Sequence, residues 1–511
     1  MRSSNTPAMG SRNSVPLFFA SRRTNLSTCL ALTLATTCST AIGQNIPHLP
    51  PEEIIQTGAA SFTQRPQDDE RPEEQFTVKW FNRPLTIGGE IDTKLRYRED
   101  VSLGRRHDDD LRLSLGLQLE FFYRLTPDTS LYIEIDPSYQ TSLYAEDDDT
   151  DTSRKIELGE LWVYVGELGN HRLSLQIGRQ YFGDQREWWW DEQLDAVRVQ
   201  YTDDSFSAQF AIGVNPTTTI STESDRPDPE DEDIIWLIAS ADWAWTKKNH
   251  FEMFFLSRLD HSPTPNVGDI ISEKWLDNED AMINWLGLRS RGRVKSDNFG
   301  KVYYWLDGGV IYGKETLLEI TDIGDNQSKI DQRRDHTISG WGLDFGATWA
   351  SKLPYQPRLT FGYAKGSGDT NPNDGMNRAY RQSGLQSNDH RFRGVNSFRY
   401  YGELSRPELS NLTIRTLALG FPLLKDSSLE LIYHRYTQVH ASDRLRNSRI
   451  RTRPKGKHRD IGEEFNIILG MEDWQQLELE LVVTQFRASK AYGIFSGKKA
   501  SSITLQVQYN F

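Results

Sequence analysis

The chain ends in the stretch Ser501-Ser502-Ile503-Thr504-Leu505-Gln506-Val507-Gln508-Tyr509-Asn510-Phe511. From Ile503 onward every odd residue is apolar or aromatic, and every even residue is polar. Successive side chains of a β-strand point to opposite faces, so the stretch predicts a strand with one apolar and one polar face. A last strand that ends on an aromatic residue is typical of outer-membrane β-barrels, in which it closes the barrel against the first strand.

The composition of the 511-residue chain is compatible with such a barrel. No run approaches the ~20 consecutive apolar residues that a transmembrane helix needs, which excludes a helical membrane protein. In a barrel only alternate residues face lipid, so a chain that is 37% hydrophobic and 26% charged can still span a membrane. The 14 Trp and 20 Tyr would supply two interfacial aromatic girdles. An aromatic-rich soluble β-sandwich is the alternative that composition leaves open.

Residues 1–43 are expected to be a signal peptide. A pair of arginines precedes an apolar run over residues 26–41, and the small residues that end at Gly43 offer a cleavage site. Both cysteines of the chain, Cys29 and Cys38, fall in this segment. The mature chain is therefore expected to have no disulfide and no thiol ligand for a metal, as suits passage through an oxidising periplasm.

Residues 44–75 are expected to be a flexible periplasmic leader, because they are rich in Pro, Gln and acids and show no periodicity. Removing residues 1–43 takes away four arginines and no acid, which leaves 55 basic against 72 acidic residues, a balance of −17. This acidic balance argues against nucleic acid as a partner.

Residues 76–511 are expected to form an all-β, antiparallel, up-and-down transmembrane barrel of about eighteen strands. Alternating segments are separated in turn by short and long connections. Short connections such as Thr126–Asp128 and Glu472–Gln476 would face the periplasm. Long polar connections such as Lys314–Thr337 and Gly366–Asn396 would face the outside. Strict alternation of short and long connections is the signature of a barrel in the Gram-negative outer membrane.

The segment Leu85–Arg98 predicts what lines the interior of the barrel. One face of this strand is apolar, and the other carries a row of charged residues: Glu90, Asp92, Lys94, Arg96 and Arg98. On a soluble sheet such a row would simply face solvent, but here the opposite face must meet lipid, so the row is expected to line a water-filled lumen. Inward Lys and Arg would suit solutes that carry carboxylates, because a guanidinium pairs bidentately with a carboxylate. Inward acids would keep binding weak enough for transit.

Three segments are more specific than a general barrel pattern. They contain Gly178-Arg179-Gln180 with Trp190–Ala196, the sequence Gln-Ser-Gly-Leu-Gln-Ser-Asn at 382–388, and Glu-Leu-Ser-Asn-Leu at 408–412. On these motifs nearly the whole mature chain resembles the alginate export family of outer-membrane porins. The resemblance implies a monomeric eighteen-stranded barrel that exports an anionic polyuronate such as alginate through an arginine-rich lumen. It also implies a periplasmic scaffold protein of the secretion machine as a partner.

The resemblance also implies which residues bind the polymer. Matched by motif, Lys94 falls on a lumen lysine of the family, Glu160 and Asp191 fall on its acids, and Arg406 falls on one of its arginines. Other family arginines are unmatched, with Gln118, Gly159, Tyr181 and Ser397 at or near their places. Nearby arginines could restore the positive wall: Arg96, Arg98, Arg179, Arg198 and Arg399. The long periplasmic turn that partly plugs the pore in the family is replaced here by a tight turn over 471–476.

Arg179 raises a question of side-chain direction. Strict alternation from Leu173 through Ile177 places Arg179 on the lipid face. Either Gly178 begins a β-bulge, or Arg179 already lies above the membrane.

Other signals in the sequence leave alternatives open. Trp188-Trp189-Trp190 could stack on sugar rings at the rim or anchor the barrel at the membrane interface. The basic segment 446–459 could contact lipopolysaccharide phosphates, form part of the pore mouth, or be an exposed loop with no specific partner. Ten histidines are scattered without the spacing of a catalytic set, so no enzyme activity, metal or cofactor is expected. A general or anion-selective diffusion porin without polymer preference is the nearest alternative to passive polymer export.

Overall fold

The structure is a computed structural model, and it describes residues 76–511 except for 147–150, 169–171, 216–232, 263–264, 273–278, 325–326, 372–373 and 475. The predicted signal peptide, residues 1–43, and the predicted leader, residues 44–75, lie outside the described residues. Among the residues that are described, no helix is long and apolar enough to cross a membrane.

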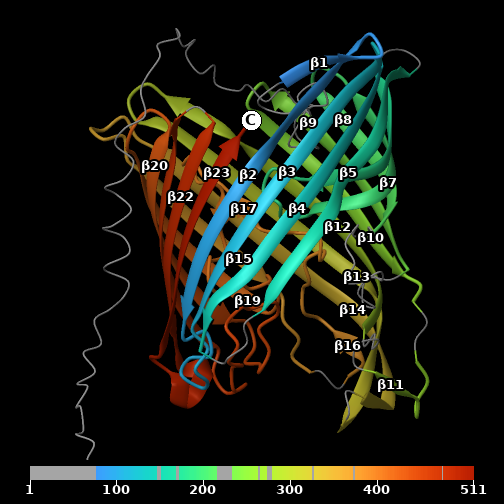
Figure 1. Cartoon of the computed structure of the whole chain (residues 1–511). Coiled ribbons are helices and arrows are strands. Elements are labelled where there is room, and N and C mark those ends of the chain that lie inside the picture. Colours follow the sequence, from blue (N-terminus) through green and yellow to red (C-terminus); the bar gives the residue numbers. More distant parts are fainter. Residues whose placement is uncertain are drawn as a thin grey trace, which may run out of the picture. The chain divides into compact units, whose positions relative to one another are not determined.

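Within the described residues, eighteen strands form one closed antiparallel barrel, which confirms the predicted fold class and strand count (Figure 1). Each barrel strand pairs with its neighbours in sequence order. The barrel strands are β2 (Arg83–Glu99), β3 (Asp110–Thr126), β4 (Thr129–Ala145), β5 (Thr152–Leu168), β6 (Leu173–Gly183), β7 (Asp191–Thr202), β8 (Phe206–Val214), β9 (Ile234–Thr246), β10 (Asn249–Asp260), β12 (Glu279–Ser296), β13 (Gly300–Gly324), β14 (Gln327–Ala350), β15 (Arg358–Gly366), β19 (Leu412–Pro422), β20 (Ser427–Gln438), β21 (Asp460–Trp474), β22 (Leu477–Ala488) and β23 (Lys499–Asn510).

The seam between the first and last barrel strands closes the barrel, as the C-terminal pattern predicts. β23 pairs with β2 from Glu90 opposite Asn510 to Glu99 opposite Ser501. At the end of the seam, the backbones of Gly89 and Phe511 exchange two hydrogen bonds of 2.9 Å. A Cβ atom at residue 89 would lie 2.1 Å from the carbonyl oxygen of Gln118, so only glycine fits where the chain end meets the wall.

The short turns lie at the end of the barrel that carries the C-terminus and β1 (Phe76–Trp80) (Figure 1). In outer-membrane barrels this end faces the periplasm. β1 pairs with Arg83–Ile87 of β2, on the strand edge that β23 leaves open beyond Phe511. β1 therefore covers an edge that would otherwise present unpaired backbone groups.

One connection predicted as a long loop is not a loop. β13 and β14 stay paired as far as Gly324 and Gln327, so the range Lys314–Thr337 is an extended hairpin. The short strand β11 (Ile270–Ser272) pairs with β14 there. Cross-strand pairs such as Arg334 Nη2 with Glu319 Oε1, at 2.8 Å, hold the two strands together. The high polar content suggested a loop, but on a solvated hairpin both faces can be polar.

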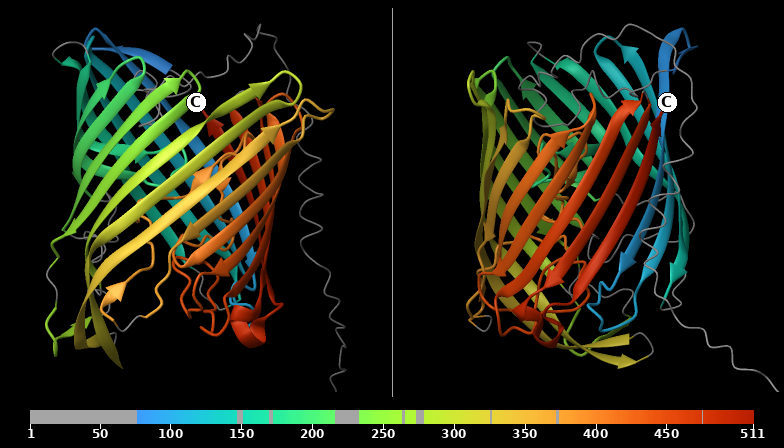
Figure 2. Two further views of the ribbon diagram at one scale, coloured as in Figure 1. Left: turned by 180° about the vertical axis from the view of Figure 1, so that it is seen from behind. Right: turned by 90° about the vertical axis from the view of Figure 1, so that its left-hand side faces the viewer.

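The second long connection, Gly366–Asn396, is also not an external loop, because the segment between β15 and β19 folds into the barrel (Figure 2). It includes β16 (Met376–Asn377), β17 (Asp389–His390) and β18 (Phe398–Arg399). The carbonyl oxygen of Arg381 accepts a 2.9 Å hydrogen bond from Trp285 of β12, and Phe392 stacks on Trp305 of β13 with ring centroids 5.8 Å apart. Asn396 donates a 2.7 Å hydrogen bond to Glu480 of β22. The segment thus contacts widely separated parts of the wall.

The seam can be tested by cross-linking. Leu95 and Leu505 are partners across it, and the Cβ atoms of directly opposite residues lie about 4.5–5.5 Å apart, close to what a disulfide bridges. We expect L95C with L505C to form a disulfide that links the two ends of the barrel and changes the mobility of the denatured chain on a gel. The matched pair L95C with Q506C, whose side chains point to opposite faces, should stay unlinked. Equal linkage of both pairs would contradict the register.

Candidate functional site

The charged row of β2 lies on the face of the strand that meets the folded-in segments. Arg96 lies beside Arg98, Arg112 and Arg406, and its Cα partner on β3 is Arg112. Ile91, on the opposite face, is 46% exposed and points outward. Lys94 lies next to Asp92 on its own strand and to Glu480 on β22. The alternation of the first strand therefore sorts its charged residues inward and its apolar residues outward.

The segment between β15 and β19 brings two further arginines to this wall. Arg399 lies in β18, with its Nε 3.7 Å from Asp389 Oδ2, and its guanidinium also donates to the carbonyl oxygen of Ser387. Arg406 Nη2 lies 3.2 Å from Glu403 Oε2, and its Nε donates to the carbonyl oxygen of the same residue at 2.9 Å. Glu403 thus holds Arg406 in place.

The segment between β20 and β21 adds Arg449, which the sequence analysis missed. Its backbone N–H donates a 3.0 Å hydrogen bond to the carbonyl oxygen of Ser405, which docks the segment beside Arg406. Burial lowers the pKa of Arg449 to about 10, and the neighbouring arginines 406, 96, 399 and 98 act in the same direction. The high density of basic residues in this segment was the available signal, but nothing in it showed that Arg449 turns inward.

These residues form one group, which we name the arginine cluster: Arg96, Arg98, Arg112, Arg399, Arg406 and Arg449. Three carboxylates pair with its members. Asp110 accepts two hydrogen bonds from Arg98, at 2.7 and 2.9 Å, and lies 2.8 Å from Arg112 Nε. The other two are Asp389 and Glu403. Among the described residues, no carboxylate pairs with Arg96 or Arg449 at ion-pair distance, and the buried Nε of Arg96 has no hydrogen-bond partner.

The arginine cluster is reachable by water. The side chains of Arg98, Arg112, Arg399 and Arg406 are 13%, 29%, 28% and 27% exposed. Burial, followed by the negative charge of Glu403, raises the pKa of Asp389 to about 7 against the opposing effect of Arg399. The charge of the group therefore depends on pH near neutrality.

Two of the predicted lumen arginines, Arg179 and Arg198, lie outside the arginine cluster and bind other residues of the barrel wall. Arg198 is 1% exposed, donates to Gln176 Oε1 at 2.5 Å, and lies over the ring of Phe182 at 4.8 Å. Arg179 is 6% exposed, and its Nε lies 2.8 Å from Asp195 Oδ1. Its Nη1 donates to the carbonyl oxygen of Leu158 at 2.9 Å.

The structure also answers the question of direction at Arg179. The register shifts in the neighbouring strand β5, where Gly159 and Glu160 together lie opposite Glu134 of β4, and Gly178 itself has φ +123°. The β5–β6 ladder then stops at Leu161 opposite Arg179. Arg179 fills the place where β6 separates from β5, so its side chain faces neither lipid nor an open lumen.

Glu160 and Asp191 form hydrogen bonds that connect β5, β6 and β7 near Arg179. Glu160 accepts hydrogen bonds from Trp162 Nε1 at 2.9 Å and from the backbone N–H of Tyr181 at 3.1 Å, in place of the missing ladder. Asp191 accepts a hydrogen bond from the hydroxyl of Tyr181, and its backbone N–H donates to the carbonyl oxygen of Leu385 at 2.5 Å. Of the two acids, Asp191 also raises the pKa of Asp389 through its negative charge.

The three consecutive tryptophans lie inside the barrel. Trp188, Trp189 and Trp190 are at most 1% exposed, so both the sugar-stacking role at the rim and the role as membrane anchor are wrong. Trp188 Nε1 donates a 2.8 Å hydrogen bond to the hydroxyl of Tyr401, and Trp189 stacks on Phe254 at 5.1 Å. The β6–β7 connection therefore packs between the wall and the folded-in β15–β19 segment.

Buried ion pairs fix this connection, residues 184–190, to the wall of β12–β14. Arg289 Nη1 lies 2.5 Å from Asp184 Oδ1. Arg186 lies 2.9 Å from Asp344 and 3.4 Å from Asp307, and its guanidinium lies between the rings of Trp305 and Tyr400, 4.5 Å from each centroid. We call this connection, with the ion pairs of Asp184 and Arg186, the inner strut. It supports the β15–β19 segment through the contacts of Arg186 with Tyr400 and of Trp188 with Tyr401.

Comparisons with known proteins agree with this architecture. The model of the alginate export family matches residues 83–505. Alginate production protein AlgE of Pseudomonas aeruginosa is 24% identical over 64% of this chain and 68% of that protein. AlgE of Pseudomonas syringae pv. tomato is 23% identical over 80% and 86%. The crystal structure of Acinetobacter baumannii OccAB1 shares the fold, with a TM-score of 0.53 and 9% identity over 84% of this chain and 97% of that one.

The resemblance drawn from the three sequence motifs is confirmed, because the family model spans β2 to β23 almost completely. The family and the closed barrel together also confirm the predicted location in the Gram-negative outer membrane. The chain belongs to the alginate export family.

Proposed function

We propose that this protein is an outer-membrane channel that exports an anionic exopolysaccharide, alginate or a similar polyuronate. The observation that carries the proposal is the arginine cluster, in which the buried Nε of Arg96 has no partner among the described residues. The family supports the substrate class, and both family and fold are those of a channel, not of an enzyme.

The arginine cluster suits a polymer with one carboxylate on each sugar. Guanidinium groups bind carboxylates through two parallel hydrogen bonds. Lys94, Arg96 and Arg98 alternate along β2, so cationic positions recur about every 6.5 Å along the strand. A polymer carboxylate can leave one position as the next engages it, which is the condition for passage through a selective pore.

The paired carboxylates limit how tightly the polymer is held. Asp110, Asp389 and Glu403 already bind arginines, so a uronate must exchange with them. Such exchange returns most of the interaction energy when the polymer moves on. Transit is passive in this scheme, and the single closed chain acts as the monomeric pore, with a periplasmic scaffold protein delivering the polymer. Outer-membrane lipid and lipopolysaccharide surround the barrel.

Removing the two arginines that lack carboxylate partners should weaken polymer binding. For R96Q with R449Q we expect block of ion current by oligomannuronate to weaken about tenfold, because each charge-assisted hydrogen bond contributes about 1.5–3 kcal/mol, part of which water replaces. The measurement is single-channel recording in a planar bilayer. The control R333Q with R334Q removes the same charge from the external hairpin and should leave the block unchanged. If an oligomer blocks neither the wild type nor the variants, a general diffusion porin is the better description.

The pKa of Asp389 predicts a pH-dependent selectivity. This pKa is raised to about 7, so lowering the pH from about one unit above it to about one unit below protonates Asp389 and removes a negative charge beside Arg399. Anion selectivity, measured as the reversal potential in a salt gradient, should therefore rise as the pH falls. D389N should be as anion-selective at high pH as the wild type at low pH and should lose the step. D374N, at a paired carboxylate of the same segment farther outside, should keep it.

Breaking the inner strut should loosen the folded-in segments without touching the arginine cluster. R186M leaves the buried carboxylate of Asp344 without a guanidinium, whereas Asp307 keeps Arg289, and an uncompensated buried charge of this kind costs about 3–5 kcal/mol. We expect larger and noisier single-channel currents and faster proteolysis of the segment between β15 and β19. R186K keeps the charge and should fall between R186M and the wild type. Currents identical to the wild type in R186M would show that the strut does not hold the pore shape.

A further inference from the structure

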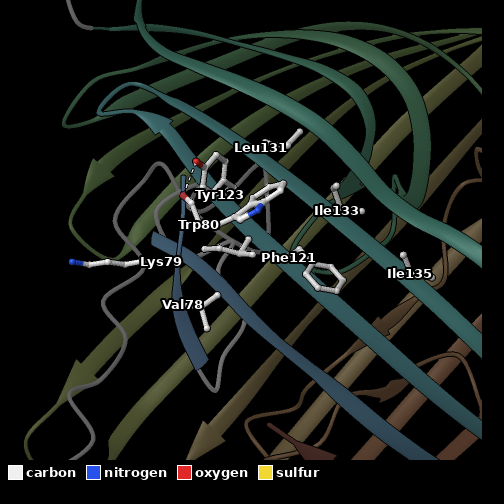
Figure 3. Close-up of a pocket in the computed structure, with 9 residues that line it drawn as sticks. Val78, Lys79, Trp80, Phe121, Tyr123, Leu131, Ile133 and Ile135 are labelled. Atoms are coloured by element: carbon white, nitrogen blue, oxygen red, sulfur yellow. Dashed lines mark hydrogen bonds between the residues drawn. The ribbon is translucent and has the colours of Figure 1, made fainter. Parts of the chain in front are cut away.

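An apolar hollow of about 380 Å³ opens between β1 and the wall of β2, β3 and β4, close to the end with the short turns (Figure 3). Its lining comes from β1 (Val78, Trp80), β2 (Leu85), β3 (Phe121, Tyr123) and β4 (Ile133). Of the described residues that line it, Lys79 alone is charged, and its side chain points away from the apolar group (Figure 3). The volume falls within the range of about 300–1,000 Å³ typical of ligand sites.

The hollow lies on the lipid-facing side of the barrel. Leu85 is on the same face of β2 as Ile91, which is 46% exposed, and Phe121 is on the same face of β3 as Leu115, which is 41% exposed. These rows continue without a change of face into the lining of the hollow. The medium that fills the hollow is therefore the bilayer and not the water of the lumen.

The β1–β2 hairpin is built to stay in the membrane interface. Its two-residue turn places Phe81 and Asn82 at φ +44° and +62°. Asparagine tolerates this conformation, but for phenylalanine it costs about 1–2 kcal/mol. Phe81 is 79% exposed and Phe76 is 67% exposed. Aromatic side chains are favourable at this level of a bilayer. Contact of the exposed Phe81 ring with lipid therefore offsets the backbone strain of the turn.

A specific contact holds β1 over the wall. The hydroxyl of Tyr123 donates a 3.1 Å hydrogen bond to the carbonyl oxygen of Trp80, and the two rings pack edge to face with centroids 5.4 Å apart. Trp80 and Tyr123 thus form the mouth of the hollow, and Phe121 and Ile133 form its apolar wall.

We propose that this hollow holds one acyl chain of a phospholipid from the periplasmic leaflet. Among the described lining residues no charged side chain points into the hollow to bind a headgroup, so the acyl chain enters and the headgroup stays at the level of Trp80 and Tyr123. The bound lipid then fixes the hairpin to the wall. The site is independent of the polymer path, because the barrel wall separates it from the arginine cluster.

The test uses the full mature chain in nanodiscs of phosphatidylethanolamine and phosphatidylglycerol, with a phospholipid that carries a photoreactive diazirine at the end of one acyl chain. We expect labelling to concentrate on β1 and on the β3–β4 segment 121–135. I133W, which fills the hollow, should reduce this labelling severalfold, whereas I212W, the same change on the outward face of β8, should not. W80A, which removes one side of the mouth, should reduce it as well, and W245A on β9 should not.

Two results would overturn the proposal. One is labelling spread evenly around the barrel and unchanged in I133W. The other is a cross-link from a photoreactive amino acid at position 133 to residues 44–75 or to a second copy of the chain, which would make the occupant protein. Resistance of the folded barrel to unfolding in detergent at room temperature checks that each variant has folded, so a loss of labelling is not a loss of structure.

Discussion

In the hydrocarbon core of a membrane, every backbone N–H and C=O needs a partner within the protein, because lipid offers none. The seam between β2 and β23 meets this requirement by leaving no edge in the ring of strands. Other features follow from closure. Alternate residues must face lipid, so the remaining ones face inward, and the charged row of β2 becomes part of the interior. Where the pairing with β23 ends, β1 pairs with the same edge of β2.

An eighteen-stranded ring encloses more space than its own side chains fill. Here the connections fill part of it. The inner strut and the β15–β19 segment pack against β10 and β12–β14 through aromatic rings and buried ion pairs. Buried charges of this kind add little net stability compared with apolar packing, but they are costly to separate. Such ion pairs therefore suit the inner strut, which holds the β15–β19 segment at one position inside the barrel.

The parts of the structure that sequence predicts well are those that alternation dictates. The last strand, the inward row from Asp92 to Arg98 and the strand number all follow from a period of two and from the lengths of turns. The missed parts depend on contacts across the lumen, which leave no periodic trace. Nothing local distinguishes Arg449, which lies beside Arg406 and Arg96, from the other basic residues of its segment, and the three tryptophans are equally compatible with surface anchors. The β13–β14 hairpin was misassigned because both of its faces meet water. Arg179 could not be placed without the bulge in the neighbouring strand.

The arginine cluster is assembled from two bodies with different supports. Arg96, Arg98 and Arg112 belong to the wall, whose curvature is set by the number of strands. Arg399, Arg406 and Arg449 belong to connections between strands, which are held to β12–β14 through the inner strut and to β21 and β22 through Glu464 and Glu480. The distance between the wall arginines and the arginines of the connections thus depends on the radius of the barrel and on the contacts that hold the connections in place. The spacing of the two halves can therefore change through substitutions in these tethers, far from the arginines themselves, with the barrel left unaltered.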